Sequence, residues 1–228
     1  MSWNEQREGI EAGRLDTFVD GSFAFILTLL LIGGGSIPDS TDKLLRALGG
    51  IPAFAVCFFQ LAFFWHGHVR WRRQCRHAEP AGRWLSLLLV FFAMIFVYPL
   101  HMVFSGAFAS VSGGHLPSDF QEVRGPADIR TLFVCYGLAF ACMAGTLTML
   151  FLHAATSAAR REFANLDARR EMRIWSVPAL IGLASALVAL LMPLSVPGWM
   201  WTIPGVMYSL LFLIGPVVDR FNRRYAPP

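Results

Sequence analysis

Six long apolar stretches, separated by short polar segments, most constrain what this chain can fold into. They cover residues 17–33, 49–68, 84–104, 131–154, 174–195 and 199–218, and the third contains no charged residue. A helix that crosses a bilayer needs about 20 predominantly apolar residues. Because only helices and closed barrels satisfy their backbone in lipid, and the alternation typical of barrel strands is absent, helices are indicated. We therefore predict an all-α membrane protein, with residues 1–228 forming a single domain of six transmembrane helices.

Composition supports a membrane protein and excludes several other classes. Of the 228 residues, 55% are hydrophobic and only 15% are charged, whereas soluble domains carry about 25% charged residues. A disordered chain and a polar soluble domain are thereby excluded. The four cysteines show no CxxC spacing, so they are interpreted as small buried side chains. The first 14 residues are polar and mixed in charge, unlike a secretory signal.

The basic residues predict the orientation of the helices. The two terminal segments and the loops after the second and fourth apolar stretches hold 15 of the 19 basic residues. With six spans these four segments lie on one side of the membrane, and positive residues favour the cytoplasmic side. Both termini are therefore predicted to be cytoplasmic in a multi-pass protein of the inner (plasma) membrane. The preference for Arg, with Lys43 as the one lysine, suggests a bacterial source, and no nucleic-acid partner is expected.

Two loops have helical character in the sequence. Residues 155–173 are expected to continue the fourth helix with their charges toward solvent. The long loop at 105–130 is expected to contain a short surface helix that begins near Ser118.

Asp20 is the acidic residue that the loops do not account for. It lies near the start of the first apolar stretch, where charge is costly and often functional. A helix of 3.6 residues per turn groups six other positions of this stretch on one face and places Asp20 on a different face. An unpaired buried carboxylate is unfavourable, so Asp20 needs a partner on another helix, or it is an ordinary helix-start carboxylate. The six positions that share the other face are Phe18, Ser22, Phe25, Thr28 or Leu29, Ile32 and Ser36.

Trp65 and His68, near the end of the second apolar stretch, are candidate partners for Asp20. They are three residues apart and share a helix face, and both side chains can donate a hydrogen bond. His66 and His68 point in different directions and are poor joint metal ligands, so no metal site is predicted. Aromatic residues and arginines at this end are also expected simply as anchors at the membrane interface.

The segment RLDTFVDGSFAFILTLLLI resembles the first helix of the prokaryotic transmembrane protein 175 family of potassium channels. Arg14, Phe18 and Asp20 match the family's Arg-x-x-x-Phe-Ser-Asp pattern, with Val19 in place of the serine. The second stretch adds Trp65-x-x-His68 near its inner end. These motifs occupy roughly the first third of the chain, while the predicted layout of six helices covers all of it.

The resemblance implies a homotetramer with one central pore, lined by four copies of the first helix. It implies a leak-like cation channel with modest potassium selectivity and no TVGYG filter, in which K⁺ is the conducted ion and no cofactor is needed. By position, the pore rings would be Phe25, Thr28 and Ile32, with Ser22 in a wider vestibule. The remaining matched side chains would form a structural network that holds the first helix: Arg14, Phe18, Asp20, Trp65 and His68.

Two other functions stay open on the sequence. A proton-conducting channel or secondary transporter would use titratable residues near the membrane, although no internal repeat is evident. A membrane haem protein or enzyme could use His101 and His153 as ligands, although each is also an ordinary histidine near a helix end. No GxSxG, HExxH or P-loop pattern occurs, so the protein is predicted not to be an enzyme.

Overall fold

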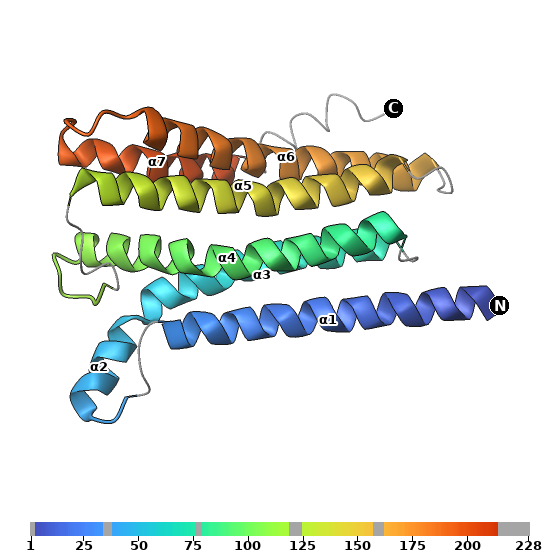
Figure 1. The fold of residues 1–228 in the computed structure, drawn as a ribbon, viewed down its shortest axis with the longest axis horizontal. Coiled ribbons are helices and arrows are strands. Elements are labelled where there is room, and N and C mark those ends of the chain that lie inside the picture. The colour runs from blue at the N-terminus through green and yellow to red at the C-terminus, as the bar shows by residue number, and fades with distance from the viewer. Residues whose placement is uncertain (1–2, 34–37, 76–78, 119–124, 157–161, 214–228) are drawn as a thin grey trace.

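The computed structural model describes residues 3–33, 38–75, 79–118, 125–156 and 162–213 (Figure 1). Long helices lie side by side, and α1 lies at one edge of the bundle (Figure 1). Their order along the chain is α1 (Trp3–Gly33), α2 (Thr41–Gly49), α3 (Ile51–Gln74), α4 (Pro80–Val111), α5 (Pro126–Thr156) and α6 (Glu162–Leu191), then η1 (Gly198–Thr202), α7 (Ile203–Val206) and η2 (Met207–Leu213).

The prediction of an all-α membrane protein is confirmed. Four helices in the described part of the chain are long and apolar enough to cross a membrane: α3, α4, α5 and residues Asp167–Leu191 of α6. The division into six spans remains a prediction. The last apolar stretch, 199–218, folds into short helical segments up to Leu213, and its end lies outside the described residues.

The helix boundaries differ from the sequence prediction at three places. Helix α1 begins at Trp3, well before residue 17, because no Gly-Pro break separates its polar first half from its apolar second half. Residues 162–173 do not continue α5; they start α6, where Glu171 is buried against the bundle rather than turned to solvent. Helix α2 is an additional nine-residue helix, while residues 119–124, which follow the predicted start near Ser118, lie outside the described part.

Close backbone contact joins α5 and α6, the most extensively paired helices of the bundle. A Cβ atom at Gly137 would lie 2.8 Å from the carbonyl oxygen of Gly182, and one at Gly182 would lie 2.9 Å from that of Gly137. Small residues allow membrane helices to approach in this way. Helices α5 and α6 therefore form a tight pair, on the opposite side of α3 and α4 from α1 (Figure 1).

An aromatic core fills the space among α3, α4 and α5. The rings of Phe64 and Phe140 are 5.3 Å apart in an edge-to-face arrangement, and Phe96 packs against both. All three side chains are fully buried. Edge-to-face aromatic pairs stabilise beyond the area that they bury, so α3 and α4 present a rigid surface on which α1 rests.

Candidate pore-lining helix

Helix α1 is packed on one side only. It contacts α4 and α3, and its buried residues recur every three or four positions: Leu15, Val19, Phe23, Ile26 and Leu30. This is the spacing of a single helix face. Val19, at the position of the family serine, is completely buried among apolar side chains. A valine suits that environment because it leaves no hydroxyl to be satisfied.

The opposite side of α1 is uncovered in the subunit. We call it the α1 stripe, and it again follows helical spacing. Phe25 is 54% exposed and Leu31 is 65% exposed. The described exposed residues of this side are Arg14, Thr17, Phe18, Gly21, Ala24, Phe25, Thr28 and Leu31.

Two of the three predicted ring residues lie on the α1 stripe. Phe25 and Thr28 are exposed there, together with Phe18. Ile32 belongs to α1, but its side chain lies outside the described residues. Ser22, the predicted vestibule residue, is only 9% exposed, and its hydroxyl donates to the carbonyl oxygen of Phe18 at 2.7 Å. The structure thus places Ser22 toward the packed side of the helix.

The α1 stripe differs in chemistry from the exposed face of α4. The α4 face consists of large apolar and interfacial aromatic side chains: Trp84, Leu87, Leu88, Phe91, Ile95 and Tyr98. Such a face suits contact with lipid. The α1 stripe instead mixes Phe25 with small and hydroxyl-bearing residues such as Gly21, Ala24 and Thr28. Small and polar residues in membrane helices favour contact with other helices or with water.

The Thr28 hydroxyl oxygen is able to coordinate a cation. It donates its proton to the carbonyl oxygen of Ala24 at 3.0 Å, one turn earlier in the helix. A hydroxyl has one donor and two acceptor lone pairs, so this bond leaves the oxygen able to accept. On an exposed helix face, Thr28 therefore offers an oxygen ligand without an unsatisfied donor.

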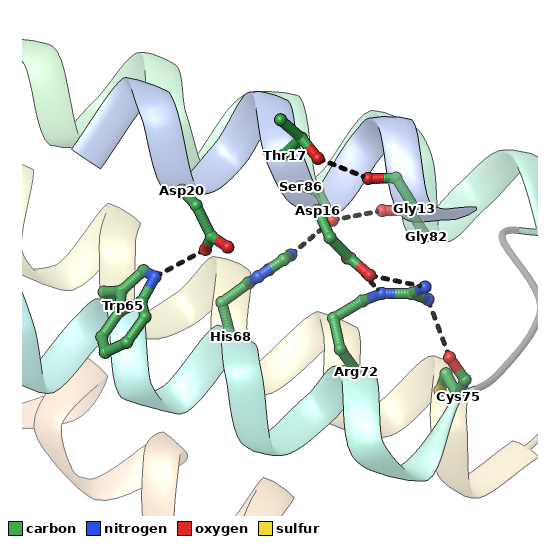
Figure 2. Close-up of polar contacts among 10 residues, drawn as sticks. All are labelled: Gly13, Asp16, Thr17, Asp20, Trp65, His68, Arg72, Cys75, Gly82 and Ser86. Atoms are coloured by element: carbon green, nitrogen blue, oxygen red, sulfur yellow. Dashed lines mark hydrogen bonds and ion pairs between the residues drawn. The ribbon is translucent and has the colours of Figure 1, made fainter. Parts of the chain in front are cut away.

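Asp20 is bonded to Trp65, one of its two predicted partners. The indole Nε1 of Trp65 donates to Asp20 Oδ1 at 2.7 Å, from α3 to α1 (Figure 2). Both side chains are exposed at the edge of the helix contact. The carboxylate thus holds α1 against α3 through a charge-assisted hydrogen bond, which is stronger than a neutral one.

His68 takes a different partner. It is fully buried, and its Nε2 lies 3.0 Å from Ser86 Oγ on α4, whose hydroxyl in turn donates to the carbonyl oxygen of Gly82 at 2.8 Å (Figure 2). Arg14 and Phe18 lie on the α1 stripe, away from this contact. The structure therefore brings together Asp20 and Trp65, and places the other three matched residues elsewhere.

A second anchor of α1 is absent from the sequence prediction. Arg72 Nε donates to Asp16 Oδ1 at 2.6 Å and Nη2 donates to Oδ2 at 3.2 Å, while Nη1 donates to the carbonyl oxygen of Cys75 at 2.7 Å (Figure 2). Asp16 precedes Asp20 by one helical turn, and Arg72 follows His68 by one turn. The two acids, four residues apart, share one face of α1, and their donors Trp65 and Arg72, seven residues apart, share one face of α3; this arrangement of acids on one helix and donors on the next is the signal that could have revealed the pair.

More ion pairs lie at the same end of the bundle. Arg83 Nη1 on α4 is 3.1 Å from Glu11 Oε2 on α1, and Arg70 on α3 pairs with the buried Glu171 on α6. His153 Nε2 on α5 is 2.9 Å from Glu79 Oε2, just before α4. His153, a candidate haem ligand on the sequence, is therefore engaged by a carboxylate.

Loss of the Asp16 carboxylate is expected to destabilise the subunit. The Arg72 side chain is only 10% exposed, so Asp16→Ala leaves a nearly buried guanidinium with fewer partners. Hydrogen bonds to charged groups are worth about 1.5–3 kcal/mol, and we expect a loss of about 2 kcal/mol in the free energy of unfolding. Thermal unfolding in detergent measures it. Asp39→Ala is the control, because its pair with Lys43 is exposed and worth at most about 1 kcal/mol. Equal effects would contradict the anchoring role.

The fold and its long apolar helices define a multi-pass helical membrane protein. Residues 14–99 match the family described as endosomal/lysosomal potassium channel TMEM175. Over 137 residues the chain is 27% identical to a protein of Marivirga tractuosa named "Potassium channel", covering 57% of this chain and 54% of that protein. The chain thus spans about half the length of this relative.

The fold is similar to that of a solved TMEM175 channel. The crystal structure of a threonine-to-alanine variant of the potassium channel MtTMEM175, in complex with a nanobody fusion, matches 92% of this chain and 93% of its own with a TM-score of 0.78 and 20% identity. The family match over residues 14–99 confirms the resemblance to the TMEM175 potassium channel family seen in the sequence, and the fold is the one seen in the MtTMEM175 structure. The matched TMEM175 family is one of channels and is not enzymatic.

Proposed function

We propose that this protein conducts K⁺ with modest selectivity, as a homotetramer whose four α1 helices line one central pore. The observation that carries the proposal is the α1 stripe, a continuous uncovered helix face on which Phe25 and Thr28 lie together. Cyclic assembly brings the same face of each subunit to the symmetry axis. It would cover this stripe while leaving the aromatic face of α4 to lipid.

The side chains of the α1 stripe support a narrow, partly apolar pore. A ring of Phe25 side chains would disfavour water and so restrict conduction by dewetting. One turn further along, a ring of Thr28 hydroxyls would supply oxygen ligands where an ion sheds part of its water. The remaining predicted ring, at Ile32, extends the same spacing toward the end of α1.

The anchors at the other end of α1 support a fixed pore helix. Trp65 and Arg72 bind two carboxylates one turn apart on α1, which resists both rotation and sliding of the helix. In this proposal Asp20 positions α1 rather than coordinating the ion. The end of the bundle that carries Arg70, Arg72 and Arg83, the arginine-rich end, faces the cytoplasm of a bacterial inner membrane in this proposal, in accord with the positive-inside rule.

Electrical recording from reconstituted protein tests the proposal. With K⁺ on one side of the bilayer and Na⁺ on the other, we expect a steady current whose reversal potential favours K⁺. A matched recording with equal K⁺ and a pH gradient identifies protons as carriers. A current that follows only the pH gradient would favour the proton pathway, and the absence of any current would refute conduction.

A further inference from the structure

The arginines at the arginine-rich end of the bundle fall into two groups. Three on α3 and α4 each pair with a carboxylate of another helix, whereas three near the start of α6 are exposed and pair with no carboxylate in the described part of the chain. The paired arginines are Arg70, Arg72 and Arg83, and those of the second group are Arg169, Arg170 and Arg173. The second group is therefore a charged patch that the fold itself does not neutralise.

The exposed face of α6 beyond these arginines is uniformly apolar. Residues Asp167–Leu191 of α6 are long and apolar enough to cross a membrane. Every exposed residue between 177 and 191 is a valine or a leucine, without the small or hydroxyl-bearing side chains that favour contact between membrane helices. We call this face the α6 stripe, and it comprises Val177, Leu180, Leu183, Leu187, Leu190 and Leu191.

Two of the arginines continue the α6 stripe toward the arginine-rich end. At 100° per residue, Arg169 and Arg173 share a face with Leu180 and Leu187, which are 64% and 55% exposed. Helix α6 lies with α5 on the side of the bundle opposite α1 (Figure 1). One outer face of α6 thus passes from apolar side chains at membrane depth to two arginines at the level of the lipid headgroups.

The geometry of Arg169 and Arg173 suits a shared anion. Side chains four residues apart on a helix are neighbours, and like charges at this spacing repel. Arg173 Nε donates to the carbonyl oxygen of Arg169 at 3.4 Å, which directs the guanidinium of Arg173 back toward Arg169 and away from the α6 stripe. A phosphate between the two guanidinium groups would accept hydrogen bonds from both and remove their repulsion.

The nearby acids do not compete for these arginines. Asp167 and Glu171 lie on the other side of α6 by helical spacing. Glu171 is buried and already pairs with Arg70. Arg170, on the flank of the same face, adds a third positive charge. The outer face of α6 therefore stays positive at this end.

We propose that Arg169 and Arg173 bind the phosphate of an anionic phospholipid, such as phosphatidylglycerol, whose acyl chains lie along the α6 stripe. Lipid is favoured over free phosphate because the apolar stripe begins directly beside the arginines. An anionic headgroup is favoured over phosphatidylcholine because choline carries a cation that the arginines repel. The site lies on one subunit and does not require the proposed pore.

Lipid binding to the full chain in mild detergent tests the site. Native mass spectrometry measures the dissociation constants for phosphatidylglycerol and for phosphatidylcholine with the same acyl chains. We expect the native chain to prefer phosphatidylglycerol. The variant with both Arg169→Gln and Arg173→Gln should bind it about tenfold more weakly, because charge-assisted hydrogen bonds to the phosphate are lost.

The matched control removes the same charge from the other end of the bundle. It carries Arg46→Gln in α2 and Arg130→Gln near the start of α5. This control should bind phosphatidylglycerol as the native chain does. Equal weakening in the control would show that net charge alone attracts the lipid and would overturn the proposal. So would a native chain that binds both lipids equally.

Two further measurements separate the source of the phosphate from an effect on folding. An excess of glycerol phosphate, which lacks acyl chains, should leave the lipid bound, and displacement would assign the arginines to free phosphate instead. Without phosphatidylglycerol, thermal unfolding should show the double variant at least as stable as the native chain, since neighbouring like charges are removed. With the lipid, only the native chain should gain stability. An equal gain in the double variant would place the lipid elsewhere.

Discussion

Thr28→Val is expected to remove most of the K⁺ preference while leaving the channel assembled. The substitution keeps the shape of the side chain and deletes the hydroxyl. Its proton is donated to the carbonyl oxygen of Ala24, and its oxygen lone pairs on the α1 stripe can coordinate a cation. Loss of an interaction worth about 1 kcal/mol corresponds to about a fivefold fall in the permeability ratio of K⁺ to Na⁺. The reversal potential between K⁺ and Na⁺ solutions measures that ratio.

Two controls make this result specific. Thr28→Ser retains the hydroxyl and should retain the preference. Thr148 on α5 makes the same kind of bond, to the carbonyl oxygen of Ala144 at 2.9 Å, but it is not on α1. Thr148→Val should therefore leave the permeability ratio unchanged. An unaltered ratio in Thr28→Val, or an equal change in Thr148→Val, would show that the selecting oxygens lie elsewhere.

Gly67→Ala is expected to cause the largest loss of stability of the substitutions considered. A Cβ atom at Gly67 would overlap the ring of Trp175 and lie 2.9 Å from Leu147 Cδ1. The Trp175 ring cannot move aside easily, because it is buried and packs against Phe63 and Phe64 at centroid distances of 4.7 and 5.8 Å. Overpacking a filled core costs about 1–3 kcal/mol, and we expect the upper end of this range.

Thermal unfolding in detergent, with and without a second substitution, checks the cause. Trp175→Phe shortens the ring that Gly67→Ala would strike, so the double variant should regain part of the stability that the two single changes lose. Gly145→Ala on α5 is the matched control, since nothing lies within 4 Å of its added Cβ. An alanine there should be neutral or slightly stabilising. If the Gly67→Ala subunit is as stable as the control, the Trp175 ring can move aside at the contact between α3 and α6, and the predicted overpacking is wrong.

The two faces of α1 were largely predictable from the sequence. Helical periodicity alone places Phe18, Phe25 and Thr28 together, and the structure leaves all three on one uncovered face. The same periodicity also groups Ser22 with them, yet Ser22 is buried. A helix wheel gives angles but not the width of the contact made by α3 and α4, and Ser22 falls just inside that contact.

The partners within the site were only half predictable. Trp65 and His68 share a face of α3 and both can donate, so the sequence could not choose between them for Asp20. In the structure their offset around the helix sends Trp65 to Asp20 and the buried His68 to Ser86. Asp16 and Arg72, although visible in the sequence, were not paired, because they are distant along the chain.

The sequence by itself determined the membrane class, the helical secondary structure, the clustering of arginine at one end and the resemblance to the TMEM175 family. These properties depend on local patterns: the length of apolar stretches, the charge of loops and a short motif. Only the tertiary structure decided which carboxylate meets which donor and which face of α1 stays uncovered. The physical reason is that these depend on the rotation and sliding of one packed helix against another. Close contacts such as that between Gly67 and Trp175 fix those positions only when the helices meet.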